Sequence, residues 1–262
     1  MSCEQCAQGY VIQGEPQGSM VNGAYLKEGP NKSRAVVLLT DIFGLPLVNC
    51  KLIADEISKN LECDVWVPDL FNGAPPFKVE EIEPLMPHRA GQKMPWWNYL
   101  RAFFVLLPRF PRLYANRASV VDPRVESFIA KIRDERKYEK VGAVGYCFGG
   151  SVGIRFGSKG LLNSLVIAHP GRCTIQEIEA IKIPTAWVLA EEDMSFSDQL
   201  RKQAEESFAK RKGTPNEVDY EFKVYKGTAH GFAARPNLAE PDLAQAYHDA
   251  LKQTIDWFKK TL

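Results

Sequence analysis

The sequence has no excess of charge of either sign. It contains 33 Lys and Arg residues against 32 Asp and Glu residues, which gives a formal net charge of +1. Proteins that bind nucleic-acid duplexes usually carry a basic surface, and no long run of like charge provides one here. We therefore expect no nucleic-acid partner. With 45% hydrophobic and 25% charged residues, the composition is that of a globular protein.

Long apolar segments are also missing. The longest runs are short, such as residues 103–107, whereas a membrane-spanning helix needs about 20 apolar residues. The first residues do not show a basic segment followed by an apolar one, as a secretory signal would. These absences predict a cytoplasmic protein with no membrane partner.

The sequence has no secretory signal that would favour disulfides between its six cysteines. A chain of 262 residues does not need disulfides to stabilise its core, so we expect reduced thiols. The six cysteines are Cys3, Cys6, Cys50, Cys63, Cys147 and Cys173.

Strand and helix patterns alternate along most of the chain. Strand patterns occur at 35–40, 64–68, 141–146, 165–168, 186–189 and 220–225. Helix patterns occur at 47–61, 124–137, 175–181 and 197–211, and the last segment has an apolar stripe of Leu243, Tyr247, Leu251, Ile255 and Phe258. Such alternation predicts an α/β fold of one domain, residues 1–262, with a mostly parallel sheet between helices on both faces. The stretch around Gly18 and Gly23 is typical of an antiparallel hairpin at the edge.

Residues 71–122 interrupt this alternation. The segment contains seven prolines and is rich in aromatic residues, including Trp96 and Trp97. A long insertion in a compact domain is often a lid or binding loop, but aromatic stripes are also commonly packed against a core. Both interpretations, lid and packed excursion, remain open.

The segment that indicates chemistry is the glycine-rich turn at residues 145–149. A buried strand leads into Gly145-Tyr-Cys147-Phe-Gly149 and then into a helix pattern, which is the nucleophile elbow with cysteine in place of serine. The sharp turn requires small neighbours, which the two glycines provide. It also places Cys147 at a helix N-terminus, which favours a thiolate, and directs the N–H of Phe148 toward a developing oxyanion.

Two other interpretations of this turn are weaker. The glycines at 142, 145 and 149 do not have the G-x-G-x-x-G spacing of a dinucleotide loop. A structural cysteine would not require glycines on both sides.

The order of elements in this fold predicts an acid and then a histidine after the nucleophile. His230 follows the last strand pattern and is the expected base, since His88, His169 and His248 fit that position less well. The acid follows the strand at 186–189, where the candidates are Glu191, Glu192, Asp193 and Asp198. We favour Asp193, because it lies far enough beyond the strand to turn back over the sheet edge and orient His230.

At these residues the sequence resembles the dienelactone hydrolase family of the α/β-hydrolase superfamily. The matching segments are Asp41-Ile-Phe-Gly44, Gly145-Tyr-Cys-Phe-Gly-Gly150, Asp193 after its strand, and Thr228-Ala-His-Gly-Phe-Ala233. The resemblance implies a Cys147–His230–Asp193 triad that opens an ester or enol-lactone by acyl transfer to sulfur. It also implies a second oxyanion donor at the N–H of Ile42, and no metal or organic cofactor.

The resemblance also suggests residues around the triad. In well-known bacterial members a glutamate hydrogen-bonds the resting thiol, and here its position is Asp41, one methylene shorter, which leaves its reach to Cys147 open. Those members bind a substrate carboxylate with arginines, for which Arg235 and Arg101 are the candidates here. His169 ends a strand at the active edge and is a further candidate substrate contact, although a histidine at such a position is more often structural.

Alternative functions remain open at this point. One is a broad carboxylesterase or thioesterase. Another is a thiol-based redox or binding protein without hydrolysis, for which Cys3-Glu-Gln-Cys6 has suggestive spacing but no second ligand pair. We expect a small-molecule ester or lactone as partner, and a monomer or homodimer.

Overall fold

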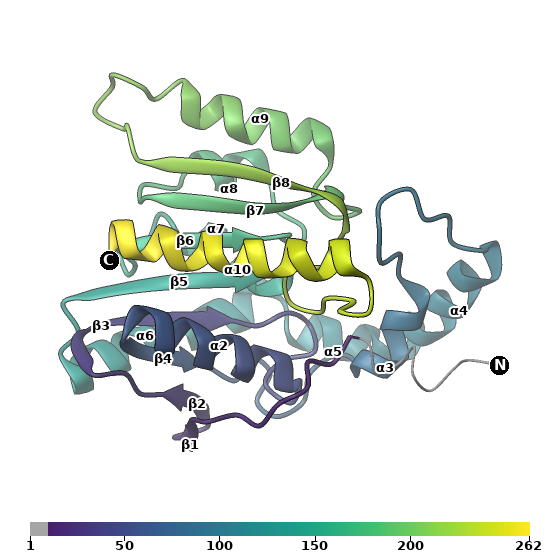
Figure 1. Ribbon diagram of the computed structural model, residues 1–262, viewed down its shortest axis with the longest axis horizontal. Helices are drawn as coiled ribbons and strands as arrows, with labels where there is room; N and C mark the ends of the chain where they lie inside the picture. Colours follow the sequence, from purple (N-terminus) through teal and green to yellow (C-terminus); the bar gives the residue numbers. More distant parts are fainter. Residues whose placement is uncertain (1–9) are drawn as a thin grey trace.

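The apolar runs of the sequence form one eight-stranded sheet (Figure 1). A computed structural model describes residues 10–262 of the chain. The strands are β1 (Ser19–Val21), β2 (Ala24–Lys27), β3 (Asn31–Leu39), β4 (Cys63–Val67), β5 (Lys140–Tyr146), β6 (Ser164–Ala168), β7 (Thr185–Glu192) and β8 (Tyr220–Ala229). The helices are α2 (Val48–Leu61), α3 (Val79–Ile82), η1 (Glu83–Leu85), α4 (Trp96–Leu106), η2 (Leu107–Arg109), α5 (Phe110–Ala115), α6 (Ala118–Arg136), α7 (Phe148–Phe156), α8 (Ile175–Glu179), α9 (Asp198–Ala209) and α10 (Pro241–Thr261).

The sheet has the predicted mostly parallel topology. Its order is β1-β2-β4-β3-β5-β6-β7-β8, and all strands from β3 onward are parallel to their neighbours. β1 and β2 form the expected antiparallel hairpin, and β2 pairs with β4 at the edge. Because the carboxyl ends of parallel strands meet at one edge, residues that follow different strands come together there.

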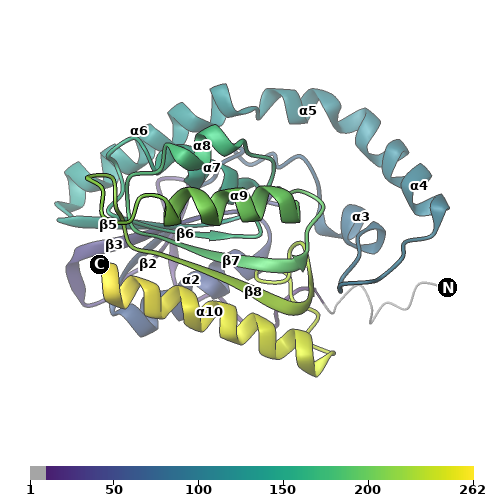
Figure 2. The ribbon, with the colours of Figure 1, turned by 90° about the horizontal axis from the view of Figure 1, so that it is seen from above.

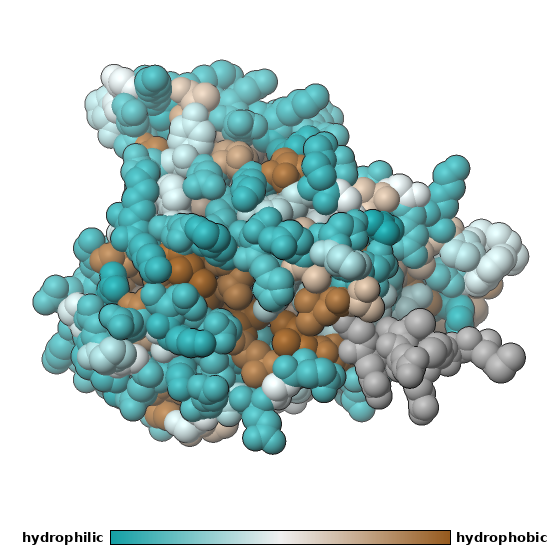
Figure 3. Space-filling model, viewed as in Figure 1, coloured by the Kyte–Doolittle hydropathy of each residue, from teal (hydrophilic) through white to brown (hydrophobic). Residues whose placement is uncertain are grey.

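Helices cover both faces of the sheet, as predicted. α2 and α10 lie on one face, and α6, α7, α8 and α9 lie on the other (Figure 2). Each face has its own cluster of buried side chains, because alternate residues of a strand point to opposite faces. Figure 3 shows apolar residues as a band across the region of α2 and α10. Partly buried Ile12, Leu251 and Leu262 pack against the cluster beneath these helices.

Several element boundaries differ from prediction. α6 begins at Ala118 rather than at residue 124, because the helix accommodates Pro123 near its N-terminus. β7 continues through Glu191 and Glu192, polar residues that suggested a loop, and β8 continues to Ala229. The two strands stay paired to the Glu192–Ala229 position, with a register shift after Ala190.

The 71–122 insertion forms α3, η1, α4, η2, α5 and the first turns of α6. α3 and α4 lie on the side toward which the parallel strands point (Figure 1). A small apolar cluster that includes Phe43 and Phe77 lies under it. No residue of α4 or α5 is buried, and Trp96 is 71% exposed. Val105 of α4 and Leu113 of α5 pack against that cluster, so the lid and the packed excursion both stay predictions.

None of the helices among the described residues combines the length and the apolar character needed to cross a bilayer.

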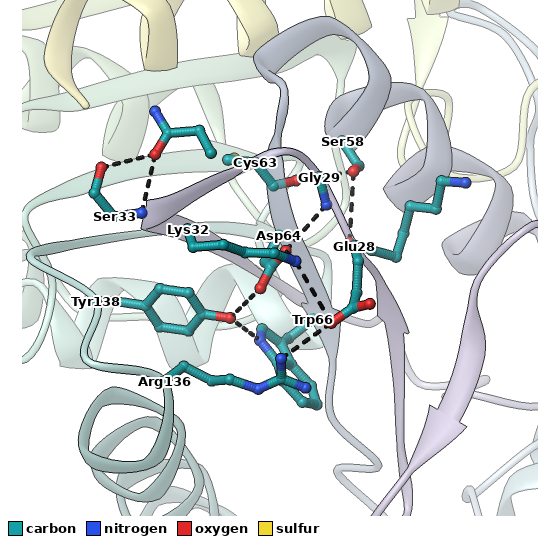
Figure 4. Close-up of polar contacts among 12 residues, drawn as sticks. Glu28, Gly29, Lys32, Ser33, Ser58, Cys63, Asp64, Trp66, Arg136 and Tyr138 are labelled. Carbon is teal, nitrogen blue, oxygen red and sulfur yellow. Dashed lines mark hydrogen bonds and ion pairs between the residues drawn. The ribbon is translucent and has the colours of Figure 1, made fainter.

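A buried carboxylate holds the amino ends of the strands together. Asp64 is the second residue of β4, lies opposite Ala35 of β3 and is completely buried. It accepts hydrogen bonds from Gly29 N (3.0 Å), Lys32 Nζ (2.8 Å) and the Tyr138 hydroxyl (2.5 Å) (Figure 4). Burial and the neighbouring carboxylate raise the pKa of Tyr138 above its usual value, so the phenol remains a donor.

We expect Asp64→Ala to destabilise the fold by about 2–4 kcal/mol, because it leaves the Gly29 N–H and the Tyr138 hydroxyl without an acceptor. Urea unfolding measures this loss. Asp134→Ala, which removes an exposed carboxylate paired with Lys137, is the control and should leave the midpoint unchanged. Equal midpoints for both variants would show that the Asp64 contacts do not contribute to stability.

Candidate active site

β5 enters α7 through a sharp turn at Cys147. This residue has φ 50° and ψ −111°, a conformation that side-chain-bearing residues rarely adopt. A Cβ on Gly145 would lie 2.2 Å from the carbonyl oxygen of Gly149, and a Cβ on Gly149 would lie 2.1 Å from that of Leu39. Glycine is therefore required at both positions, and the predicted turn is confirmed. Strained backbone of this kind costs about 1–3 kcal/mol and is concentrated at functional sites.

An imidazole and a carboxylate meet at the same edge of the sheet. Asp193 directly follows β7, and His230 directly follows β8. The Nδ1 atom of His230 lies 2.9 Å from each carboxylate oxygen of Asp193. Asp193 also accepts hydrogen bonds from the N–H groups of Ser195 (2.8 Å) and Phe196 (3.2 Å), which fix its orientation. Cys147 lies close enough to His230 to influence the pKa of its ring.

The other acidic candidates point elsewhere. Glu191 accepts hydrogen bonds from Lys226 Nζ (2.8 Å) and Gly227 N (2.7 Å), and thus joins the ends of β7 and β8. Glu192 accepts from Gly91 N (2.9 Å). Asp198 begins α9 and pairs with Arg201 at 2.8 Å. Of the four candidates, Asp193 is the one bonded to His230.

His230 is held in its charged form. Burial disfavours an imidazolium, but the charge of Cys147 and the charge and hydrogen bond of Asp193 outweigh burial and raise the pKa of His230 to about 10. The charge of Cys147 is the largest single raising influence. The imidazole therefore carries a proton at neutral pH.

The two predicted oxyanion donors are the backbone N–H groups of Ile42 and Phe148. Phe148 is the first residue of α7, and Ile42 follows β3, whose end is bonded to the turn by the Gly149 N–H to Thr40 O hydrogen bond (2.9 Å). Within residues 10–262, neither N–H group has a protein acceptor. Both are thus available to a developing negative charge.

A buried arginine lies between two carboxylates beside this site. The Nη1 of Arg235 donates to Asp41, and its Nε donates to Glu83. Its side chain is 4% exposed, and it is close enough to Cys147 that the sulfur's charge helps raise the pKa of the guanidinium. Burial raises the pKa of Asp41, and Arg235 opposes that rise.

Asp41 faces Arg235 rather than the sulfur. Its Oδ1 accepts from the Phe43 N–H (3.1 Å), and its Oδ2 is bonded to Arg235. No hydrogen bond joins it to Cys147 among the described residues, so these contacts do not support a gating role for Asp41.

Glu83 was missed by sequence reasoning. It is a single glutamate in the proline-rich insertion, at the start of η1, and no period or spacing marks it. Arg235 lies 152 residues later in the chain, and only the fold brings the two side chains together.

The other candidate substrate contacts, His169 and Arg101, differ in their exposure. His169 is completely buried at the end of β6, and its ring lies edge-on to that of His230 with centroids 5.1 Å apart. Burial, followed by the charges of His230 and Arg235, lowers the pKa of His169 well below the usual value, so it is neutral. Arg101 is exposed on α4, without a polar partner among the described residues.

The remaining histidines lie outside this cluster. His88 is half-buried, with Nδ1 3.9 Å from Glu83, and its ring stacks on Tyr10. His248 is exposed on α10, as expected.

A cavity of about 420 Å³ opens beside His230. Its lining is Pro87, Glu191, Glu192, Asp193, Met194, Ser197, Asp198 and His230. A much smaller cavity on the other side of the ring includes Glu83, His88 and Arg235 in its lining. His230 therefore lies between an open acidic cavity and the buried arginine.

The described cysteines are Cys50, Cys63, Cys147 and Cys173, and all four are free thiols. Cys3 and Cys6 lie outside the described residues. Within residues 10–262, no group of three or more His, Cys, Asp and Glu side chains is arranged to hold a metal ion.

Comparisons with known proteins identify the family of this chain. The family model of the dienelactone hydrolase family matches residues 107–262, more than half of the chain. The hydrolase tropI of Talaromyces stipitatus is 32% identical over 264 residues, which cover 97% of this chain and 94% of that protein. A human carboxymethylenebutenolidase homolog is 26% identical and covers 90% of this chain and 86% of its own length.

Solved structures show the same fold. A putative dienelactone hydrolase from Klebsiella pneumoniae superposes with a TM-score of 0.63 at 13% identity, over 90% of this chain and 92% of that one. The fold is thus the predicted α/β-hydrolase fold. From the family match and the relative of 32% identity, the chain belongs to the dienelactone hydrolase family of ester-bond hydrolases.

Proposed function

We propose that this protein hydrolyses a small-molecule ester or enol-lactone with Cys147 as nucleophile, His230 as proton carrier and Asp193 as the group that orients His230. The observation that carries the proposal is the hydrogen-bonded pair of Asp193 and His230 beside Cys147, at a turn that two glycines make possible. Nucleophile, base and orienting acid in hydrogen-bond reach are what acyl transfer requires.

In the first half of the reaction, the Cys147 thiolate attacks the carbonyl carbon of the substrate. The carbonyl oxygen becomes an oxyanion, which accepts hydrogen bonds from the Ile42 and Phe148 N–H groups. When the carbonyl re-forms, the C–O bond to the leaving group breaks, and the leaving oxygen takes the proton of His230 or departs as a stabilised enolate. The product of this half is a thioester on Cys147.

In the second half, His230 acts as a base. Formation of the thioester removes the charge from sulfur, which is the largest influence raising the pKa of the imidazole, so burial then lowers that pKa. Neutral His230 takes a proton from water, and the hydroxide formed attacks the thioester carbon. The C–S bond breaks, the acid product leaves, and the imidazolium–thiolate pair is restored.

We expect Cys147→Ala to lower kcat/KM for a 4-nitrophenyl ester at least about a thousandfold while the protein stays folded, because the nucleophile is lost. Intact mass spectrometry after rapid quenching should show an acyl adduct on the wild-type protein only. Cys63→Ala, which removes a buried thiol at the start of β4, far from the carboxyl ends of the strands, is the matched control. Full hydrolysis by Cys147→Ala, or acylation of another residue, would rule the proposal out.

The titration of His230 provides a second test. In Cys147→Ala we expect the pKa of His230 to fall clearly below the value of about 10 in the intact protein, since the charge of sulfur is gone. NMR titration of the imidazole protons measures it, and with four histidines in the chain the signals can be assigned by substitution. An unchanged pKa would mean that sulfur does not set the charge of this ring.

Stability should follow the same titration. The folded pKa lies above the unfolded value of 6.5, so His230 stabilises the folded state fully below pH 6.5 and loses that contribution as pH rises to about 10. The difference in unfolding free energy between wild type and His230→Gln should therefore shrink over this window in urea titrations. A difference that grows with pH would contradict a raised pKa.

A further inference from the structure

The guanidinium of Arg235 is paired with two carboxylates. Nε and Nη1 are bonded to Glu83 and Asp41, and the flat face of the group lies 4.8 Å from the centroid of the Phe43 ring. The third nitrogen, Nη2, lies against Gly231: a Cβ there would come within 2.3 Å of it. The one buried cation next to Cys147, other than His230, is thus paired with two carboxylates, and its Nη2 donates to no protein group among the described residues.

The charge of this cluster is not positive. One guanidinium lies between the carboxylates of Asp41 and Glu83, both of which are buried. The cluster has a net charge of −1 when both carboxylates are ionised. It is neutral when burial keeps one proton on Asp41, whose pKa is raised. In either state it offers no attraction to an anionic substrate group.

The accessible cavity beside His230 also carries no positive charge from Lys or Arg. The 420 Å³ cavity beside His230 is lined by Glu191, Glu192, Asp193 and Asp198, and none of its lining residues is Lys or Arg. The cations that pair with these acids, Lys226 and Arg201, do not line it. An anion that enters this cavity meets carboxylates and finds no free cation.

We propose that the site selects substrates whose acyl part is uncharged or cationic and discriminates against acyl parts that bear a carboxylate, and that Glu83 is a residue that sets this specificity. Glu83 acts by neutralising Arg235, the cation that would otherwise attract an anionic acyl group near Cys147. This inference rests on the proposed hydrolytic function and names the substrate class of that site.

Three 4-nitrophenyl esters of similar length test the selectivity of the wild-type protein: the methyl ester of the adipate monoester, the free adipate monoester, and a 6-trimethylammoniohexanoate. They differ chiefly in the charge at the far end of the acyl chain. We expect kcat/KM for the neutral and cationic esters to exceed that for the anionic ester by at least about tenfold. Equal values, or a preference for the anion, would overturn the inference.

Glu83→Gln tests the assignment to this residue. The amide keeps an acceptor for Arg235 but removes one negative charge, so we expect the ratio of anionic to neutral kcat/KM to rise several-fold. Glu126→Gln removes an exposed carboxylate that pairs with Lys159 and should leave the ratio unchanged. A folded Glu83→Gln protein with the wild-type ratio would show that Glu83 does not set the selectivity.

The outcomes separate the two proposals. If wild type hydrolyses none of the three esters and forms no adduct on Cys147, the proposed function fails. If it hydrolyses them without regard to charge, only the selectivity fails. If Glu83→Gln does not fold, as its far-ultraviolet circular dichroism would show, the ranking of the three esters by wild type still decides whether the site rejects anions.

Discussion

The site depends on the electrostatic coupling between Cys147 and the imidazole of His230, two side chains that are both shielded from water. Burial alone would strip the proton from His230, and the charge of Cys147 together with Asp193 reverses that tendency. In a buried site such an attraction is screened little, so the state of one group sets the state of the other. In the proposed mechanism this coupling gives direction to proton transfer. The imidazole is an acid while the sulfur is charged, and it becomes a base once the sulfur is acylated.

The fold makes this pairing possible by means that are mostly local. Gly145 and Gly149 allow the turn that presents Cys147, and replacing either would drive a Cβ into a backbone carbonyl. β7 and β8 remain paired up to Glu192 and Ala229, so the next residue of each strand, Asp193 and His230, can meet. Glu191 strengthens that junction through Gly227. At the opposite edge, Asp64 ties the amino ends of the strands, so the geometry of the sheet is held at both ends.

The sequence predicted those parts of the molecule that have a period or a spacing. Buried β-branched runs gave the parallel sheet, and the order of elements led to Asp193 and His230, which the structure brings together with Cys147. Long-range pairing of single polar residues has no such signal. Glu83 lies in a proline-rich segment, and its contact with Arg235 spans 152 residues, so only the folded chain shows it. The same contact explains why Arg235 and Asp41, which were expected to face substrate and thiol, face each other instead.

The two cations near the sulfur differ in one physical respect. An imidazolium can give up its proton during a reaction, whereas a guanidinium cannot under any ordinary condition. A bare Arg235 would therefore stabilise the thiolate permanently and make it a poorer nucleophile, and it would hold an anionic product in the site. Two buried carboxylates, one from the end of β3 and one from the insertion, cancel that fixed charge. The positive charge that remains beside the sulfur is that of the His230 imidazolium, whose proton the reaction can transfer.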